Sequence, residues 1–127
     1  IFGLTTSIDL SLRFGDLGIG QQLADVAPFV DYISPMVYPS TYEPGNLGLR
    51  DPGNSPYEVV KISVADGRER AGKTLVRPWL QYNNAGGTDW GPREFRLEKQ
   101  AAEESGAYGW LFWNIWGQYD LETFDPQ

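Results

Sequence analysis

Four short apolar runs, widely spaced along the chain, constrain its fold most strongly. They are rich in β-branched and aromatic residues and bounded by Gly, Pro, Asn or Asp, as buried strands are. Successive runs begin 30, 42 and 35 residues apart. A hairpin needs far fewer residues, whereas a strand–helix–strand unit takes about 30 or more. The spacing therefore predicts parallel strands with a helix in each interval. The runs cover residues 2–8, 32–38, 74–80 and 109–114.

Helix signals occupy the three intervals between these runs. A capping box with Ser55, Pro56 and Glu58 opens the second helix, and Gly72 ends it. A Gly-Pro start and a Ser-Gly stop predict the third helix over residues 91–106. An apolar face, interrupted by a proline that would end or kink the helix, predicts the first. The residues of that first pattern are Ile19, Leu23, Ala27, Val30 and Pro28.

The resulting order is βαβαβαβ, an α/β arrangement of parallel units. A TIM (β/α)₈ barrel needs about 250 residues. With 127 residues and four βα units, the chain has the size of half a barrel. We expect one domain over residues 1–127, and a fragment of a longer protein because the chain opens on Ile1. A lone half-barrel would expose two sheet edges, so we expect the missing N-terminal half or a second copy, in a homodimer, to complete it.

Charge and composition exclude several classes of function. Lys and Arg number 10 against 17 Asp and Glu, a net charge of −7 that argues against nucleic acid. The chain has no Cys and no His, which excludes disulfides, thiolate nucleophiles, Ser-His triads and His/Cys zinc sites. We expect no cofactor and no metal, and the apolar runs are too short for membrane insertion. The compartment stays open between a secreted or cell-envelope bacterial protein and a cytoplasmic one.

Polar and aromatic residues gather where the predicted strands end. The carboxyl ends of parallel strands meet at one edge of the sheet, where ligands bind in such folds. Aromatic rings stack on sugar faces and amides pair with hydroxyl groups, so this edge predicts a carbohydrate site. The alternative is that these are ordinary loop polar groups and half-buried rings. The residues expected to bind substrate are Tyr38, Gln81, Tyr82, Trp113, Asn114 and Trp116.

Glycoside hydrolysis normally needs two carboxyl groups. Asp9 is the acid closest to the carboxyl end of a predicted strand, and it is our candidate catalytic residue. The alternative for Asp9 is a turn or helix cap, since Asp favours both. Glu103 and Glu104 lie on a predicted helix and are expected to be solvated. The chain shows no convincing second carboxyl to pair with Asp9.

Five motifs, in order along nearly the whole chain, resemble the bacterial family of putative glycoside hydrolase domains with a (β/α)₈ barrel. The resemblance implies that the chain is the C-terminal half of such a barrel, and it implies a polysaccharide-type substrate. The acidic strand end most distinctive of the family belongs to the N-terminal half. The main catalytic carboxylate is therefore implied to lie outside this fragment. The motifs are DLGIGQ (16–21), ISPMVYPS (33–40), SPYEVV (55–60), RPWLQ (77–81) and GWLFWN (109–114).

These inferences combine into one hypothesis with two alternatives. The chain is the aromatic, amide-rich side of the sugar cleft of a glycoside hydrolase, with Trp113 as the stacking platform. The resemblance also implies a non-proline cis peptide bond between Trp113 and Asn114. The first alternative is a non-catalytic carbohydrate-binding or scaffold domain. The second is a purely structural assembly partner.

Overall fold

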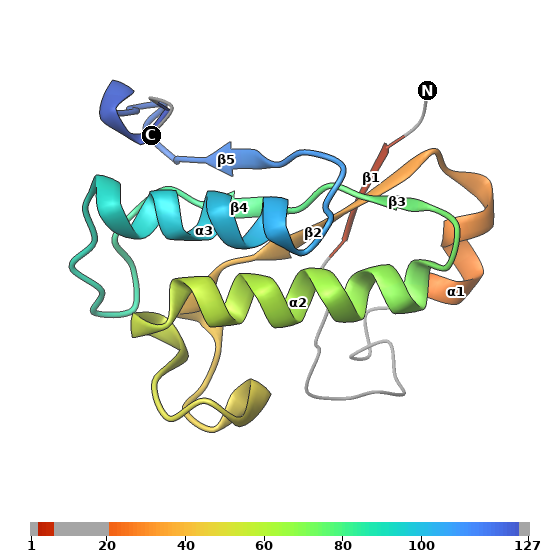
Figure 1. Cartoon of the computed structure of the whole chain (residues 1–127), viewed down its shortest axis with the longest axis horizontal. Coiled ribbons are helices and arrows are strands. Elements are labelled where there is room, and N and C mark those ends of the chain that lie inside the picture. The colour runs from red at the N-terminus through yellow and green to blue at the C-terminus, as the bar shows by residue number, and fades with distance from the viewer. Residues whose placement is uncertain (1–2, 7–20, 125–127) are drawn as a thin grey trace.

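The computed structural model describes residues 3–6 and 21–124, which form an α/β arrangement of parallel strands and helices (Figure 1). The sheet runs in the order β1-β2-β4-β5, with β3 also pairing with β2, and every pairing is parallel. This confirms the predicted α/β class and is consistent with half of a barrel. The strands are β1 (Gly3–Thr6), β2 (Tyr32–Val37), β3 (Leu75–Val76), β4 (Trp79–Gln81) and β5 (Leu111–Trp113).

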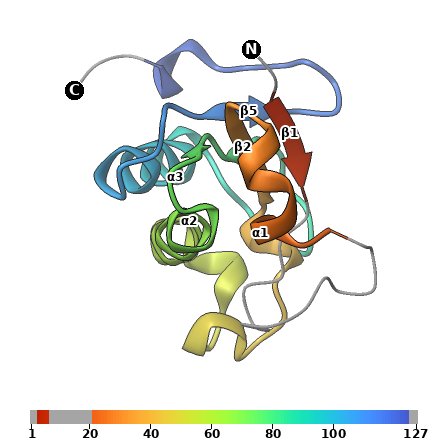
Figure 2. The same ribbon diagram turned by 90° about the vertical axis from the view of Figure 1, so that its right-hand side faces the viewer.

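The helices are α1 (Leu23–Val26), α2 (Pro56–Ala71) and α3 (Pro92–Glu104). All three pack on one face of the sheet, and α2 and α3 lie side by side across it (Figure 2). Within the described residues, none of these helices is long and apolar enough to cross a membrane. The main core joins β2, β4, α2 and α3 through Val37, Val59, Val60, Val64, Leu80, Ala101 and Ala102.

The register of the sheet sorts side chains between two faces. Val37 of β2 lies level with Leu80 of β4, which lies level with Phe112 of β5. These residues face the helices, because Val37 and Leu80 belong to the core and Phe112 packs against it. Successive side chains of a strand point to opposite faces. Trp79 and Trp113 therefore belong to the other face, which no described helix covers; we call it the open face.

The predicted third strand is interrupted in its middle. β3 pairs with β2 at Ile33 and Val76, whereas β4 pairs with β2 from Met36 onward. In this register Pro35 of β2 lies level with Pro78, between the two short strands. Neither proline has an N–H to donate to the ladder, so pairing breaks at this level.

The boundaries of α2 and α3 confirm the sequence prediction, while the start of α2 differs in detail. The Ser55 side chain makes no capping bond to the helix; its hydroxyl donates to the main-chain oxygen of Asp51 at 2.7 Å. At α3 the reciprocal half of a capping box is present, because the Gly91 N–H donates to Glu94 Oε2 at 3.0 Å. Gly72 ends α2 with a φ of 64°, a conformation that favours glycine.

The first helix is shorter than predicted. It covers Leu23–Val26 and continues as a 3₁₀ turn over Ala27–Phe29, which contains Pro28. A proline inside a helix removes a hydrogen bond, which accounts for the change of winding. Leu23 and Ala27 are buried as the apolar face predicted. Ile19 lies outside the described residues.

Candidate functional site

The carboxyl ends of β2, β4 and β5 meet at one edge of the sheet, beside the first turns of α2 and α3 (Figure 1). The register decides where the predicted site residues go. Gln81 lies level with Trp113, so the side chains of both residues belong to the open face. Tyr82 and Asn114 come one residue later and therefore belong to the opposite side.

The open face carries an aromatic pair. The rings of Tyr38 and Trp113 are stacked, with centroids 6.3 Å apart and an interplanar angle of 26°. Trp113 remains 42 % exposed, and Tyr38 is half-buried. Burial raises the pKa of the Tyr38 hydroxyl, and the charge of Glu98 raises it further. The hydroxyl therefore stays protonated at neutral pH and can donate a hydrogen bond.

Gln81 lies level with Trp113 in the sheet and is buried, with only 1 % of its surface exposed. Its Oε1 accepts a hydrogen bond from the Ser40 N–H at 3.1 Å, and its Nε2 donates to the Asn83 oxygen at 2.8 Å. The side chain thereby ties the loop that follows β2 to the loop that follows β4. Its polar atoms hold the main chain in place.

Tyr82 is also buried, on the helix side. Its ring stacks on Phe95 of α3, with centroids 4.2 Å apart. Its hydroxyl accepts a hydrogen bond from the Asp120 N–H at 2.8 Å and lies 2.9 Å from the Thr123 hydroxyl. Through these contacts Tyr82 connects the segment after β5 to α3. Its role in the structure is therefore packing on the helix side of the sheet.

Asn114 shapes the turn that follows β5. Its side-chain nitrogen donates to the Tyr82 oxygen, and its Oδ1 accepts from the Trp116 N–H at 2.8 Å. Trp116 projects from this turn and is 71 % exposed. The peptide bond between Trp113 and Asn114 is trans, so the predicted cis bond is wrong. The turn is held by the Asn114 amide, which needs no cis bond.

Glu98 is a residue that the sequence analysis missed. It lies on α3, fully buried, and its Oε1 accepts a hydrogen bond from the Gln81 N–H at 3.3 Å. Its Oε2 is buried without a partner among the described residues. Burial raises the pKa of this carboxyl well above its usual range, against the opposing effect of the Gln81 N–H. The sequence spacing could have indicated this burial. Glu98 follows Phe95 by three residues and precedes Ala102 by four, so it lies on the same buried face of α3 as these two residues.

The other acids considered from the sequence have different places. Asp9 lies outside the described residues. Asp51 caps a short 3₁₀ turn, where its two oxygens accept from the Asn54 N–H at 3.2 Å and the Asn54 amide at 2.8 Å. Glu103 and Glu104 are exposed, as expected. Over residues 3–6 and 21–124, no three Asp, Glu, His or Cys side chains gather in a way that could hold a metal ion.

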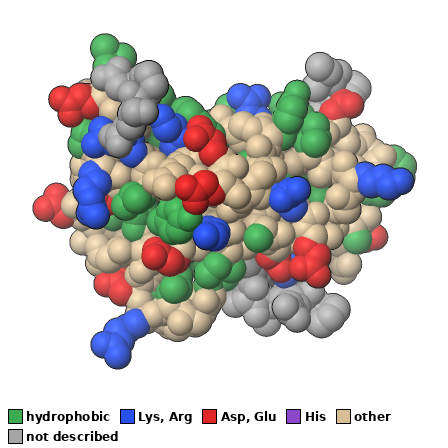
Figure 3. Space-filling view, viewed as in Figure 1, with side chains coloured by type: hydrophobic (Ala, Val, Ile, Leu, Met, Phe, Trp, Pro, Cys, Tyr) green, Lys and Arg blue, Asp and Glu red, His purple; other side chains and the backbone are tan. Residues whose placement is uncertain are grey.

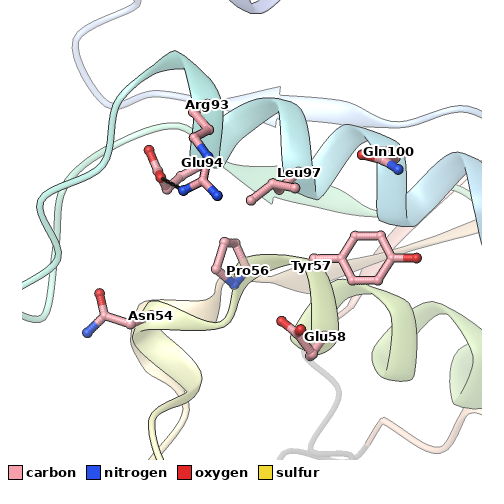
Figure 4. A pocket seen from close by; sticks show the side chains of 8 residues that line it. All are labelled: Asn54, Pro56, Tyr57, Glu58, Arg93, Glu94, Leu97 and Gln100. Carbon is pink, nitrogen blue, oxygen red and sulfur yellow. Dashed lines mark hydrogen bonds and ion pairs between the residues drawn. The ribbon is translucent and has the colours of Figure 1, made fainter.

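Two cavities lie near the strand ends. One, of about 420 Å³, lies between the first turns of α2 and α3 (Figure 4). Charged groups line it, including Glu58 and the Arg93–Glu94 ion pair at 3.1 Å. Partial burial raises the pKa of Glu94, but the Gly91 N–H bond and Arg93 outweigh it and lower the pKa. Acidic and basic side chains are interspersed over this helix face (Figure 3). The pocket is therefore lined by charges of both signs, among them Glu58 and Arg93.

The second cavity, of about 710 Å³, lies between the loop after β4 and the turn after β5. We call it the lateral groove. It brings together Tyr82, Asn114 and Trp116, three of the six predicted binding residues. Tyr38, Gln81 and Trp113 do not line it. The structure thus divides the predicted residues between the open face and the lateral groove.

The comparisons with known proteins support the interpretation of the sequence. A family model described as "Putative glycosyl hydrolase domain" matches residues 1–119. No curated protein and no solved structure shows significant similarity to the chain. The family match covers nearly the whole chain and confirms the resemblance of its motifs. The chain belongs to this family of putative glycosyl hydrolase domains.

Proposed function

We propose that the chain forms the sugar-binding wall of a glycoside hydrolase that acts on a polysaccharide or oligosaccharide. The observation that carries this proposal is the stacked Tyr38–Trp113 pair on the open face, where Trp113 is 42 % exposed. The pair lies at the carboxyl ends of parallel strands, where ligands bind in parallel α/β folds. Membership in a glycosyl hydrolase family supports the class of ligand.

The chemistry of the pair suits a pyranose. Trp113 offers a flat apolar ring on which the C–H face of a sugar can lie, while Tyr38 has a protonated hydroxyl. In this proposal Gln81 and Glu98 act as positioning residues, because their polar atoms hold the strand ends. Asn114 has the same role at the turn after β5.

The reaction would be hydrolysis of a glycosidic bond through an oxocarbenium-like transition state, which takes an acid and a base or nucleophile. We assign Asp9 as a candidate acid or base in this chain. The other carboxylate would come from the missing N-terminal half of the barrel, or from a second copy of the chain. Either partner would pair with the outer edges of β1 and β5, which have no neighbouring strand among the described residues.

Reducing-end release from a broad panel of polysaccharides, including amino-sugar polymers, tests the reaction. We expect release to disappear in Asp9→Asn, because the amide cannot transfer a proton, while binding of the polymer persists. We expect Trp113→Ala to lose binding and release together. Ile115→Ala is the matched control, since Ile115 is an exposed apolar residue of the same turn. A chain that is folded but binds no glycan of the panel would contradict the proposal.

A non-catalytic carbohydrate-binding domain is the second candidate. Among the acids at the strand ends, Asp51 is used in a cap and Glu98 is fully buried, which favours binding without cleavage. Binding that depends on Trp113, with no release by the chain alone, would support this candidate. If reducing ends are released only after the upstream half is added, the result would instead support the hydrolase proposal.

A further inference from the structure

The lateral groove has the size and setting of a ligand site. Its volume of about 710 Å³ lies within the range of about 300–1,000 Å³ usual for small-molecule sites. Buried aromatic residues form its base, among them Tyr82, Trp90 and Phe95. One wall comes from the loop after β4 and the other from the turn after β5. The packed base and the two walls belong to different elements, so the groove is built by the tertiary structure.

The most exposed of the five tryptophans stands on one wall. Trp116 is 71 % exposed, compared with 42 % for Trp113 and 6 % for Trp90. Its main chain is fixed, because the Trp116 N–H donates to Asn114 Oδ1 and the Gly117 N–H donates to the Asn114 oxygen at 3.1 Å. Gly117 has a φ of 65°, which an L side chain adopts only with strain. The exposed ring is therefore presented on an ordered turn, which reduces the entropy that binding would cost.

Side-chain amides accompany this ring. Asn83 and Gln118 line the groove, and neither side-chain amide forms a hydrogen bond within the described residues. The Asn84 amide, in contrast, is used internally, since it accepts from the Trp90 N–H at 2.7 Å and donates to the Trp90 oxygen at 3.1 Å. The groove thus has a rigid loop and two amides that are available for a ligand. An amide both donates and accepts, as a sugar hydroxyl does.

The charge of the groove selects among ligands. Among the described residues, no Lys or Arg lines the groove, and Asp120 is the one carboxylate there. Asp120 is already engaged, since its Oδ1 accepts from the Glu122 N–H at 3.0 Å. A phosphate, sulfate or uronate ligand would meet no positive charge and would approach a carboxylate. The lining therefore favours an uncharged, hydroxyl-rich ligand with one flat apolar face.

We propose that the lateral groove is a second glycan subsite, which binds uncharged pyranose units through Trp116, Asn83 and Gln118. The class of ligand rests on the proposed function, but the site is separate from the Tyr38–Trp113 pair. Trp113 and Trp116 are three residues apart, so their Cα atoms lie within about 11 Å of one another. One oligosaccharide of several units can therefore reach both rings, whereas a short one reaches a single ring.

Titration of the full chain with neutral cello-, chito- and manno-oligosaccharides of increasing length tests the subsite, monitored by NMR shifts and tryptophan fluorescence. We expect Trp116→Ala to weaken binding of the longer oligosaccharides about five- to tenfold. Disaccharide binding should be unchanged, because Trp113 is intact. Asn83→Ala should give a smaller loss in the same length range. Ile115→Ala is the matched control and should leave every affinity as in the unmodified chain.

Three results would overturn the subsite, and they separate it from the proposed function. If Trp113→Ala abolishes binding while Trp116→Ala matches the unmodified chain at every length, the subsite fails and the proposed function stands. If no oligosaccharide binds to the folded chain, both fail. If a proline-rich peptide shifts the Trp116 and Asn83 resonances while oligosaccharides do not, the groove is a peptide site.

Discussion

Tyr82 and Trp113 are aromatic residues at the ends of neighbouring strands, yet they have opposite surroundings. Tyr82 is 4 % exposed and stacks on Phe95, whereas Trp113 is 42 % exposed and stacks on Tyr38. The register places Gln81, and not Tyr82, level with Trp113. The side of the sheet that α3 covers therefore receives Tyr82, and the open face receives Trp113. Residue type alone does not separate a buried packing ring from an exposed ring; the face of the sheet does.

The polar groups follow the same division. The Tyr82 hydroxyl bonds within the chain to Asp120 and Thr123. Glu98, also on the helix side, supports the main chain of β4 from below. The helix side of the strand ends is thus a network that stabilises the fold. On the open face, in contrast, Trp113 keeps 42 % of its surface exposed.

The largest expected effect is on the helix side. We expect Tyr82→Ala to lower the free energy of unfolding by about 3–5 kcal/mol, because it removes a buried ring and leaves a cavity. Tyr82→Phe keeps the ring and removes the hydroxyl, for which we expect about 1–3 kcal/mol. Urea unfolding followed by circular dichroism measures both. If Tyr82→Ala lowers the free energy of unfolding no more than Trp113→Ala does, the contrast between the helix side and the open face is contradicted.

Gln81→Ala should have the next largest effect. The change leaves the partly buried Ser40 N–H without its acceptor, at a cost of about 1–3 kcal/mol. The same urea experiment measures it. Gln118→Ala is the matched control, since Gln118 is exposed, and its stability should stay within about 0.5 kcal/mol. Equal stability of the two variants would show that the buried amide is not needed to join the loops.

Glu98→Gln should change how stability depends on pH. Burial raises the folded-state pKa of Glu98 above its usual 4.5. As pH rises above that value, the unfolded chain releases this proton while the folded chain keeps it, so stability falls through this window. We expect Glu98→Gln to remove that fall and to match the unmodified chain below pH 4.5. Thermal unfolding across pH measures the slope. Glu69→Gln, at an exposed glutamate of α2, should leave it unchanged.

Trp113→Ala should have the smallest effect on stability and the clearest effect on binding. We expect the free energy of unfolding to change by no more than about 1 kcal/mol, since 42 % of Trp113 is already exposed. Glycan binding should be lost. Unfolding and titration of the same preparation measure the two quantities. A large loss of stability with unchanged glycan affinity would assign Trp113 to packing and favour a purely structural domain.

The order of elements and the ends of the longer helices could be predicted from the sequence because their causes are local. Pro56 and Gly72 bound α2, and Gly91 and Pro92 open α3, through backbone preferences that do not depend on distant partners. The aromatic and amide residues of the candidate site can also be predicted from the sequence, because they lie at the ends of apolar runs. The sequence alone therefore identifies Tyr38 and Trp113 as candidates, whereas their contact depends on the pairing of distant strands.

Only the tertiary structure decided the features that depend on the register of the strands and on the burial of side chains. The break between β3 and β4 arises where Pro35 and Pro78 come level, which only the register determines. The division of the predicted residues between the open face and the lateral groove has the same cause. Glu98 is buried because α3 turns it toward β4, and its raised pKa follows from lost solvent. Local preferences fix where elements begin and end, whereas the pairing of distant segments decides which side chains meet water.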